Sequence, residues 1–161
     1  MRLTMMLAGL ALIMAPAMAI AETPIDGTDP AILEQQLREM GYAPDKFDIG
    51  TQTATTVLHF QSETLALILG GCTSGKKCTY AALAGHFSDV KKPPADWVAK
   101  MNSDYDLIKV WISDEGELSY SAGSVITGMQ RATLKAWIDL VISSSDDLGA
   151  EAIKAGLGPK K

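Results

Sequence analysis

The residues most suited to chemistry in this chain are its two cysteines, Cys72 and Cys78, which enclose a short polar segment between two apolar runs. A polar segment with a central glycine is typical of a hairpin loop. In an oxidising compartment, cysteines at the facing ends of paired strands form a disulfide, and closing so small a ring stabilises a fold by roughly 2 kcal/mol. We therefore predict a bridge that fixes the loop and the register of its strands.

A metal site is the alternative for the same cysteines, because His59 and His86 flank them and would complete a Cys2His2 set. The spacing argues against it, since zinc knuckles separate their cysteines by about two to four residues and this pair is further apart. The two histidines also fall on separate predicted strands. Redox catalysis usually needs a C-x-x-C pair at a helix N-terminus. We expect neither a metal nor a cofactor.

Two other patterns resemble catalytic motifs but lack a required part. Residues 70–77 match the G-x4-G-K of a phosphate-binding loop, yet Lys77 stands where serine or threonine must bind magnesium. Asp114 and Glu115 could act as the acid and base of a hydrolase, but adjacent acidic residues in a turn are usually only solvated. There is no nucleophile elbow and no H-E-x-x-H motif. The sequence predicts no catalytic residue.

Composition limits the class of partner. The chain has 161 residues, with 14 basic and 19 acidic side chains and a net charge of −5. An acidic balance disfavours nucleic acid and anionic lipid as the main partner. The length and the 47% of apolar residues suit one domain with one core.

The first 21 residues are predicted to be a signal peptide. Arg2 supplies a positive charge, and the apolar run over residues 3–14 is shorter than the roughly 20 residues of a membrane-spanning helix. Alanines at 17–19 and 19–21 form A-x-A patterns that signal peptidases cleave. We expect cleavage near Ala21, which gives a periplasmic or secreted mature chain without a membrane anchor.

The elements that must position these residues are predicted in the order helix, four strands, helix, two strands, helix. The first helix begins at the capping pair Asp29-Pro30 and ends at Gly41. A middle helix begins at Pro93. Strands are predicted near 47–52, 54–61, 63–70, 78–87, 107–112 and 117–122.

The last helix has the clearest amphipathic pattern, with apolar residues at Leu134, Trp137, Ile138 and Val141. Three serines at 143–145 are expected to end it. We therefore divide the chain into a signal peptide at 1–21, an α+β domain at 22–145, and a short helix with a flexible tail at 146–161. The domain is predicted to hold one antiparallel sheet of five to six strands with helices packed on it.

Short motifs over residues 31–142 resemble the YbjN domain family, bacterial sensory transduction regulators structurally similar to type III secretion chaperones. The resemblance implies a binding module that can be dimeric, rather than an enzyme. The motifs are Leu37-Arg38-Glu39-Met40-Gly41-Tyr42, Gly71-Cys72, Lys77-Cys78-Thr79, Gly85-His86-Phe87, Asn102, Asp114-Glu115-Gly116 and Trp137.

The strand Leu65–Leu69 is apolar at both parities, although a strand with one wet face should alternate. Helices can cover one of its faces. The other could meet a second copy, a client protein or an apolar ligand, unless the strand is simply central and covered by the C-terminal segment. We name as the candidate partner or dimer face Leu65, Leu67, Leu69, Trp111 and Tyr120.

Three functions remain open. The leading hypothesis is a non-catalytic periplasmic protein-interaction module that acts as an adaptor, chaperone-like holder or regulator. The alternative is a periplasmic carrier of a small apolar ligand, which requires a closed pocket. A hydrolase that uses Asp114 and Glu115 is the weakest of the three.

Overall fold

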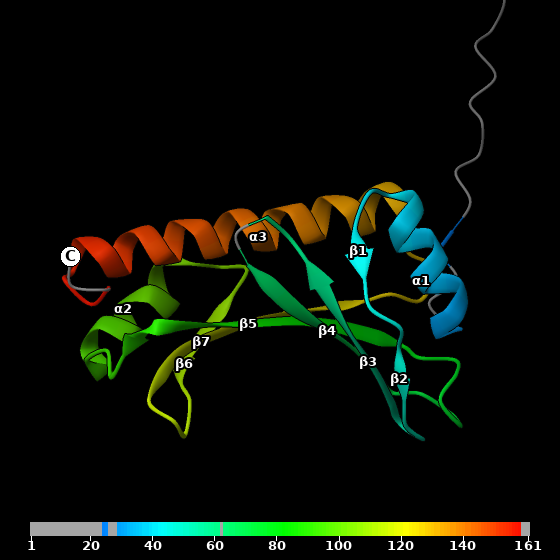
Figure 1. Cartoon of the computed structure of the whole chain (residues 1–161), viewed down its shortest axis with the longest axis horizontal. Coiled ribbons are helices and arrows are strands. Elements are labelled where there is room, and N and C mark those ends of the chain that lie inside the picture. The colour runs from blue at the N-terminus through cyan, green and yellow to red at the C-terminus, as the bar shows by residue number, and fades with distance from the viewer. Residues whose placement is uncertain (1–23, 26–28, 62, 159–161) are drawn as a thin grey trace, which may run out of the picture.

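The computed structural model describes residues 24–25, 29–61 and 63–158, which hold three helices and a seven-stranded antiparallel sheet (Figure 1). The signal peptide predicted at 1–21 lies outside the described residues. No described helix has the length and apolar character needed to cross a membrane. The helices are α1 (Pro30–Glu39), α2 (Ala95–Asp104) and α3 (Arg131–Lys154). The strands are β1 (Ala43–Pro44), β2 (Asp48–Ile49), β3 (Thr53–His59), β4 (Thr64–Gly70), β5 (Tyr80–Lys91), β6 (Lys109–Ile112) and β7 (Glu117–Val125).

The sheet confirms the predicted α+β class. Its strands lie in the order β1-β3-β4-β5-β7-β6, and β2 also pairs with β3. The four main predicted strands correspond to β3, β4, β5 and β7, and the short β6 pairs with β7 at one edge. The strand predicted at 47–52 is only the two-residue β2, and β1, also two residues long, was not predicted. Strands so short carry almost no sequence pattern.

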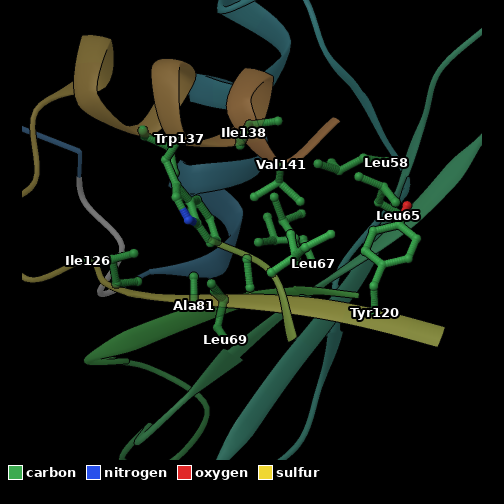
Figure 2. Close-up of a cluster of buried hydrophobic side chains, with 14 of the residues drawn as sticks. Leu58, Leu65, Leu67, Leu69, Ala81, Tyr120, Ile126, Trp137, Ile138 and Val141 are labelled. Atoms are coloured by element: carbon green, nitrogen blue, oxygen red, sulfur yellow. The ribbon is translucent and has the colours of Figure 1, made fainter. Parts of the chain in front are cut away.

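Helix α3 lies along one face of the sheet and supplies most of the cover for the core (Figures 1 and 2). Every second residue of β4 points toward it, so Leu65, Leu67 and Leu69 are at most 1% exposed. Trp137, Ile138 and Val141 of α3 pack in the same cluster (Figure 2). Each fully buried leucine stabilises the fold by about 1.5–3 kcal/mol, which makes this layer the main source of stability.

The predicted end of the last helix at Ser143–Ser145 is wrong, because α3 continues through these serines to Lys154. Their hydroxyls remain compatible with a helix, since Ser144 Oγ donates to the Leu140 carbonyl at 2.9 Å and Ser145 Oγ lies 2.8 Å from the Ile142 carbonyl. Burial then continues beyond them at Leu148 and Ala152. The short helix predicted within 146–161 is therefore the C-terminal part of α3, and the predicted boundary after 145 falls inside this helix.

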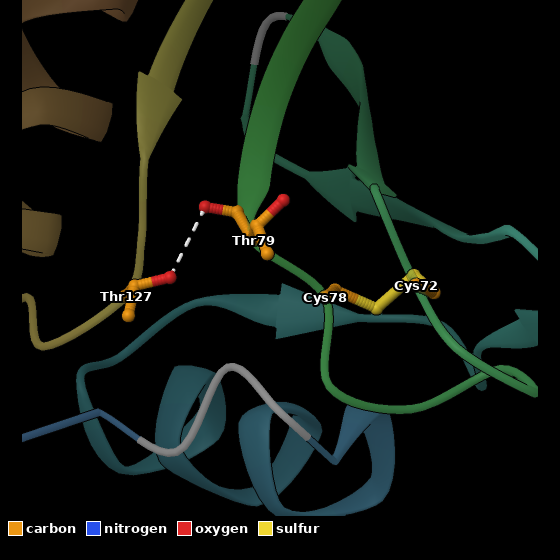
Figure 3. The surroundings of a disulfide bond; sticks show 4 residues. All are labelled: Cys72, Cys78, Thr79 and Thr127. Atoms are coloured by element: carbon orange, nitrogen blue, oxygen red, sulfur yellow. Dashed lines mark hydrogen bonds between the residues drawn. A yellow bond between two sulfur atoms is a disulfide. The ribbon is translucent and has the colours of Figure 1, made fainter.

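The predicted Cys72–Cys78 disulfide is present in the structure (Figure 3). Its loop is tied to the rest of the fold: Gly75 N–H donates to the Thr51 carbonyl at 2.9 Å, and Lys76 Nζ pairs with Asp29 Oδ2 at 2.8 Å. Asp29 is also the N-cap of α1. The disulfide loop thus connects the end of β4, the start of β5 and the first turn of α1.

The free edge of β6 is closed by a side chain of α2. Asn102 donates from Nδ2 to the Val110 carbonyl at 2.7 Å and accepts from Val110 N–H at 2.8 Å. The amide thereby pairs with both backbone groups of the edge strand, as another strand would. This contact gives a physical reason for the asparagine at this position and limits strand addition at that edge.

Removing the disulfide should lower thermal stability without changing the fold. We expect Cys72→Ser to lose roughly 2 kcal/mol, because the bond mainly restricts the unfolded chain. For a domain of this size, the midpoint of a circular dichroism melt should fall by roughly 5–10 °C. Wild-type protein in reductant should show the same fall, whereas Lys77→Ala, with the bond intact, should not. An unchanged melting temperature of Cys72→Ser under non-reducing conditions would contradict a formed disulfide.

Candidate functional site

The face of the sheet opposite α3 is not covered by any of the described helices (Figure 1). Successive side chains of a strand point to opposite faces, so the residues between the buried ones reach this side. We call this surface the open face. Its central residues are Val57, Ala66, Ile68, Tyr80, Ala82, Ala84, Trp111, Ser121, Gly123 and Val125.

Small residues occupy the middle of the open face. Ala66 on β4 lies opposite Ala84 on β5, which in turn lies opposite Ser121 on β7. In the next row, Ala82 separates Ile68 from Gly123. The result is a floor of short side chains on which another backbone or a long side chain can lie close to the sheet.

Larger apolar side chains stand at the two ends of this floor. Tyr80 and Val125 face each other across β5 and β7 and are 48% and 68% exposed. Trp111 stands at the other end on β6 and is 37% exposed. An exposed apolar surface of this kind marks an interaction site more often than isolated apolar side chains do.

Four of the five residues named from the sequence as the partner face are not on it. Leu65, Leu67, Leu69 and Tyr120 are buried in the core beneath α3. Only Trp111 is exposed on the open face. The error has a simple cause: β4 is apolar at both parities, and sequence alone does not say which parity meets the helix. The leucines face inward, and Ala66 and Ile68 face outward.

Tyr120 belongs to a partly buried polar cluster that the sequence did not reveal. Its hydroxyl donates to Glu63 Oε2 at 2.9 Å, and Ser145 Oγ lies 3.1 and 3.2 Å from the two carboxylate oxygens of Glu63. Burial, with the charge of Glu63 adding to it, raises the pKa of the Tyr120 hydroxyl well above its ordinary value. The cluster joins β7, α3 and the residue just before β4.

A glycine makes room for this tyrosine. A Cβ atom at Gly85 would lie 2.5 Å from the Tyr120 hydroxyl oxygen and 2.8 Å from Leu65 Cδ2. Gly85 and Tyr120 are directly opposite each other on β5 and β7. The Gly85 of the sequence motif is therefore explained by close packing above the ring.

A cleft of about 490 Å³ opens beside the cluster, between β5 and the second half of α3. Its lining is mixed, with carboxylates next to apolar side chains: Glu63, Thr64, His86, Phe87, Ser88, Asp89, Val90, Asp146, Gly149 and Ile153. Among the described residues, histidines, cysteines and carboxylates do not gather in threes in a way that could hold a metal ion. We assign no ligand to this cleft.

A second hollow, of about 340 Å³, lies on the open face beside Trp111. We call it the Trp111 groove; it is lined by Ala66, Ala84, Gly85, His86, Trp111, Ser113, Glu115, Glu117 and Ser119. The groove is open along the sheet and has carboxylates on its rim. A carrier of small apolar ligands would need a closed apolar pocket, which this groove does not provide.

The structure does not assemble the Cys2His2 set. Cys72 and Cys78 are bonded to each other, and His59 Nε2 contacts Asp45 Oδ1 at 3.0 Å. His59 pairs with the first residue of β4, whereas Cys72 follows the last. The cysteines and His59 therefore lie at opposite ends of the β3–β4 pair.

Glu115, one of the two turn carboxylates, also lacks the property that a general acid needs. Asp114 and Glu115 are exposed neighbours in the β6–β7 turn. Hydrogen bonds from its own backbone amide and from the Ser113 hydroxyl hold the pKa of Glu115 below its ordinary value. A carboxyl group that acts as a general acid at neutral pH needs a raised pKa. Because the pKa of Glu115 is lowered, this side chain is ionised and does not fit that role.

Comparison with known proteins agrees with the motif resemblance. The family model named YbjN, described as "Putative bacterial sensory transduction regulator", matches residues 29–154. This match spans every helix of the described structure and the whole sheet. No curated protein and no solved structure matches the chain. The family description is that of a regulator and not of an enzyme.

The Glu63–Tyr120–Ser145 cluster should contribute to stability. We expect Tyr120→Phe to lower the free energy of unfolding by about 1–2 kcal/mol, because Glu63 loses a hydrogen-bond donor in a partly buried place. Tyr80→Phe is the matched control, since the Tyr80 side chain is exposed on the other face of the same sheet. Urea denaturation of both variants measures the difference. Equal stability of Tyr120→Phe and wild type would contradict the role of the cluster.

The same cluster should make the free energy of unfolding decrease at alkaline pH. Because the folded-state pKa of Tyr120 is raised, the unfolded chain releases this proton first, and stability should fall as pH rises above about 10. The Tyr120→Phe protein should show a shallower fall between pH 7 and the alkaline range. The stability of this variant should still decrease with rising pH, because the pKa values of Tyr42 and Tyr105 are raised as well.

Proposed function

The chain belongs to the YbjN family, and from this premise we propose that it is an exported, non-catalytic interaction module that binds a partner protein on its open face. In this role it acts as an adaptor or regulator. The observation that carries the proposal is the open face itself: small residues form its floor, exposed apolar side chains stand at its ends, and none of the described helices covers it.

The shape of the sheet supports a face rather than an edge as the binding surface. One edge is formed by β6, whose Val110 already pairs with Asn102. The other edge is formed by strands of two residues each, β1 and β2. Short or capped edges offer few free backbone groups for another strand, whereas the open face extends across β3, β4, β5, β7 and β6.

Export is the second part of the proposal. The N-terminal residues have the charge, apolar run and A-x-A patterns of a signal peptide. The Cys72–Cys78 bridge supports the same compartment, because disulfides persist in the periplasm and outside the cell and are rare in the cytosol. Partner binding would then take place in the periplasm or outside the cell.

Site-specific photocrosslinking in the native host tests the binding surface. A benzoylphenylalanine in place of Val125 or Tyr80, both exposed on the open face, should join the full chain to the same protein from both positions. The matched control is Leu140 on the outer side of α3, which is 58% exposed and so similar to Val125. Crosslinks at Leu140 but not on the open face, or equal crosslinking to many proteins from every position, would overturn the proposal.

Export is tested by sequencing the N-terminus of the protein recovered by osmotic shock. We expect the mature chain to begin at Glu22, because cleavage follows Ala21. Leu10→Arg should keep the chain in the cytoplasm with its signal intact, since a charge interrupts the apolar run. Wild-type protein that starts at Met1 and stays in the cytoplasmic fraction would contradict export.

A further inference from the structure

The Trp111 groove combines three features that together select one kind of side chain. Its floor is made of small residues, Ala66 and Ala84, which leave room above the sheet. One wall is the indole of Trp111, which is partly exposed. The rim carries Glu115 and Glu117. The small floor residues leave room for a long aliphatic stem, and the indole can stack with a flat cation. The carboxylates can accept hydrogen bonds from a planar group with several N–H donors.

The charge in the groove is predominantly negative. Glu115 is held ionised by the hydrogen bonds described above and, as a carboxylate, can accept more than those two. The basic side chain among the lining residues is His86, whose Nε2 lies 3.9 Å from Glu117 Oε2. Lys92 lies against Gly116 of the same turn but does not line the groove. Lys109 is exposed on the same side of β6 as Trp111 and lies opposite Ser121, so it borders the floor, but it does not line the groove. Within the groove itself, a cation beside Trp111 is attracted mainly by Glu115.

We propose that the Trp111 groove binds an arginine side chain of an extended segment of the partner protein. This inference rests on the proposed function and adds the chemistry of the partner. The guanidinium stacks on the Trp111 ring and donates to the Glu115 carboxylate, while its aliphatic stem lies over Ala66 and Ala84. Arginine can both stack on an aromatic ring and pair with a carboxylate through its planar fork.

Lysine fits the same groove less well. Its ammonium is a compact, strongly hydrated charge that cannot make the bidentate contact and stacks poorly. The size of the groove agrees with one long side chain and the backbone that carries it, because about 340 Å³ is at the lower end of ligand sites. A folded helix would need a wider surface.

A second copy of this chain is a poorer occupant. Its two described arginines already have partners: Arg38 contacts Glu34 and the Pro44 carbonyl, and Arg131 contacts Glu39. The net charge of −5 also makes two copies repel and a basic segment attract. The partner is therefore expected to be a different protein with an exposed basic segment.

Peptide titration followed by NMR tests this chemistry. The probe is a blocked pentapeptide with a central arginine between valine and threonine residues. It is added to the full mature chain, in which the backbone amides and the indole N–H groups carry an isotope label. Otherwise identical peptides carry lysine or the neutral isostere citrulline. We expect the arginine peptide to bind with a dissociation constant of about 1 mM, about tenfold more tightly than the citrulline peptide. The Trp111 indole signal should shift most.

Single substitutions in the groove should show how much the indole and the carboxylate each contribute to peptide binding. Trp111→Ala and Glu115→Gln should each weaken binding of the arginine peptide at least about fivefold. Glu115 lies in an exposed turn, so its variant keeps the fold even if Trp111→Ala does not. The matched control is Asp147→Asn, which removes an exposed carboxylate from α3 and should leave binding unchanged.

The outcomes separate this inference from the proposed function. Equal binding of arginine and citrulline peptides, shifts centred on the Glu63 cleft, or no binding at about 5 mM peptide would overturn the arginine site. If open-face crosslinks to a partner persist in that case, the proposed function stands and only its chemistry is wrong. Absence of both the crosslinks and the peptide-induced shifts would contradict the arginine site and the proposed function together.

Discussion

The structure depends above all on the burial of one side of a single sheet under α3. Every second residue of β3, β4, β5 and β7 points into this layer, and the leucines of β4 are almost completely removed from water. A two-layer fold has one covered sheet face and one uncovered face. The open face is therefore not a defect of packing but the direct result of placing all the apolar cover on one side.

The Glu63–Tyr120–Ser145 cluster shows how this layer extends along the helix. The first half of α3 packs through Trp137, Ile138 and Val141, and the second half through Leu148 and Ala152. Ser145 stands between the two halves and meets a carboxylate from the strand side. A buried polar group that is hydrogen-bonded fixes geometry more sharply than apolar contact. The cluster thus sets how α3 lies on the sheet, while its polar atoms remain satisfied.

The ends of the sheet are fixed by other means, and this leaves the open face as the available surface. The disulfide loop holds the β4–β5 connection against the start of α1, and Asn102 occupies the backbone groups of Val110 on β6. With the edges short or paired and one face covered, the floor between Tyr80 and Trp111 remains exposed, and the proposed partner would bind there. The acidic rim beside Trp111 then distinguishes one end of this floor from the other.

Local sequence determined most of the elements and the covalent link. The capping pair Asp29-Pro30, the i, i+3, i+4, i+7 pattern around Trp137 and the loop between Cys72 and Cys78 act over a few residues, so they can be read without a fold. The family motifs likewise rest on short segments. These signals gave the α+β class, the strand order along the chain and the disulfide.

Only the tertiary structure decided which parity of β4 is inside, how far α3 extends and which groups meet at Glu63. The serines at 143–145 are neutral in local pattern, and the helix continues through them because Leu148 and Ala152 beyond them are buried in the core. Glu63 meets Tyr120 and Ser145, which lie 57 and 82 residues further along the chain. Long-range contacts of this kind depend on how layers pack, and a strand that is apolar at both parities does not encode which side faces the helix.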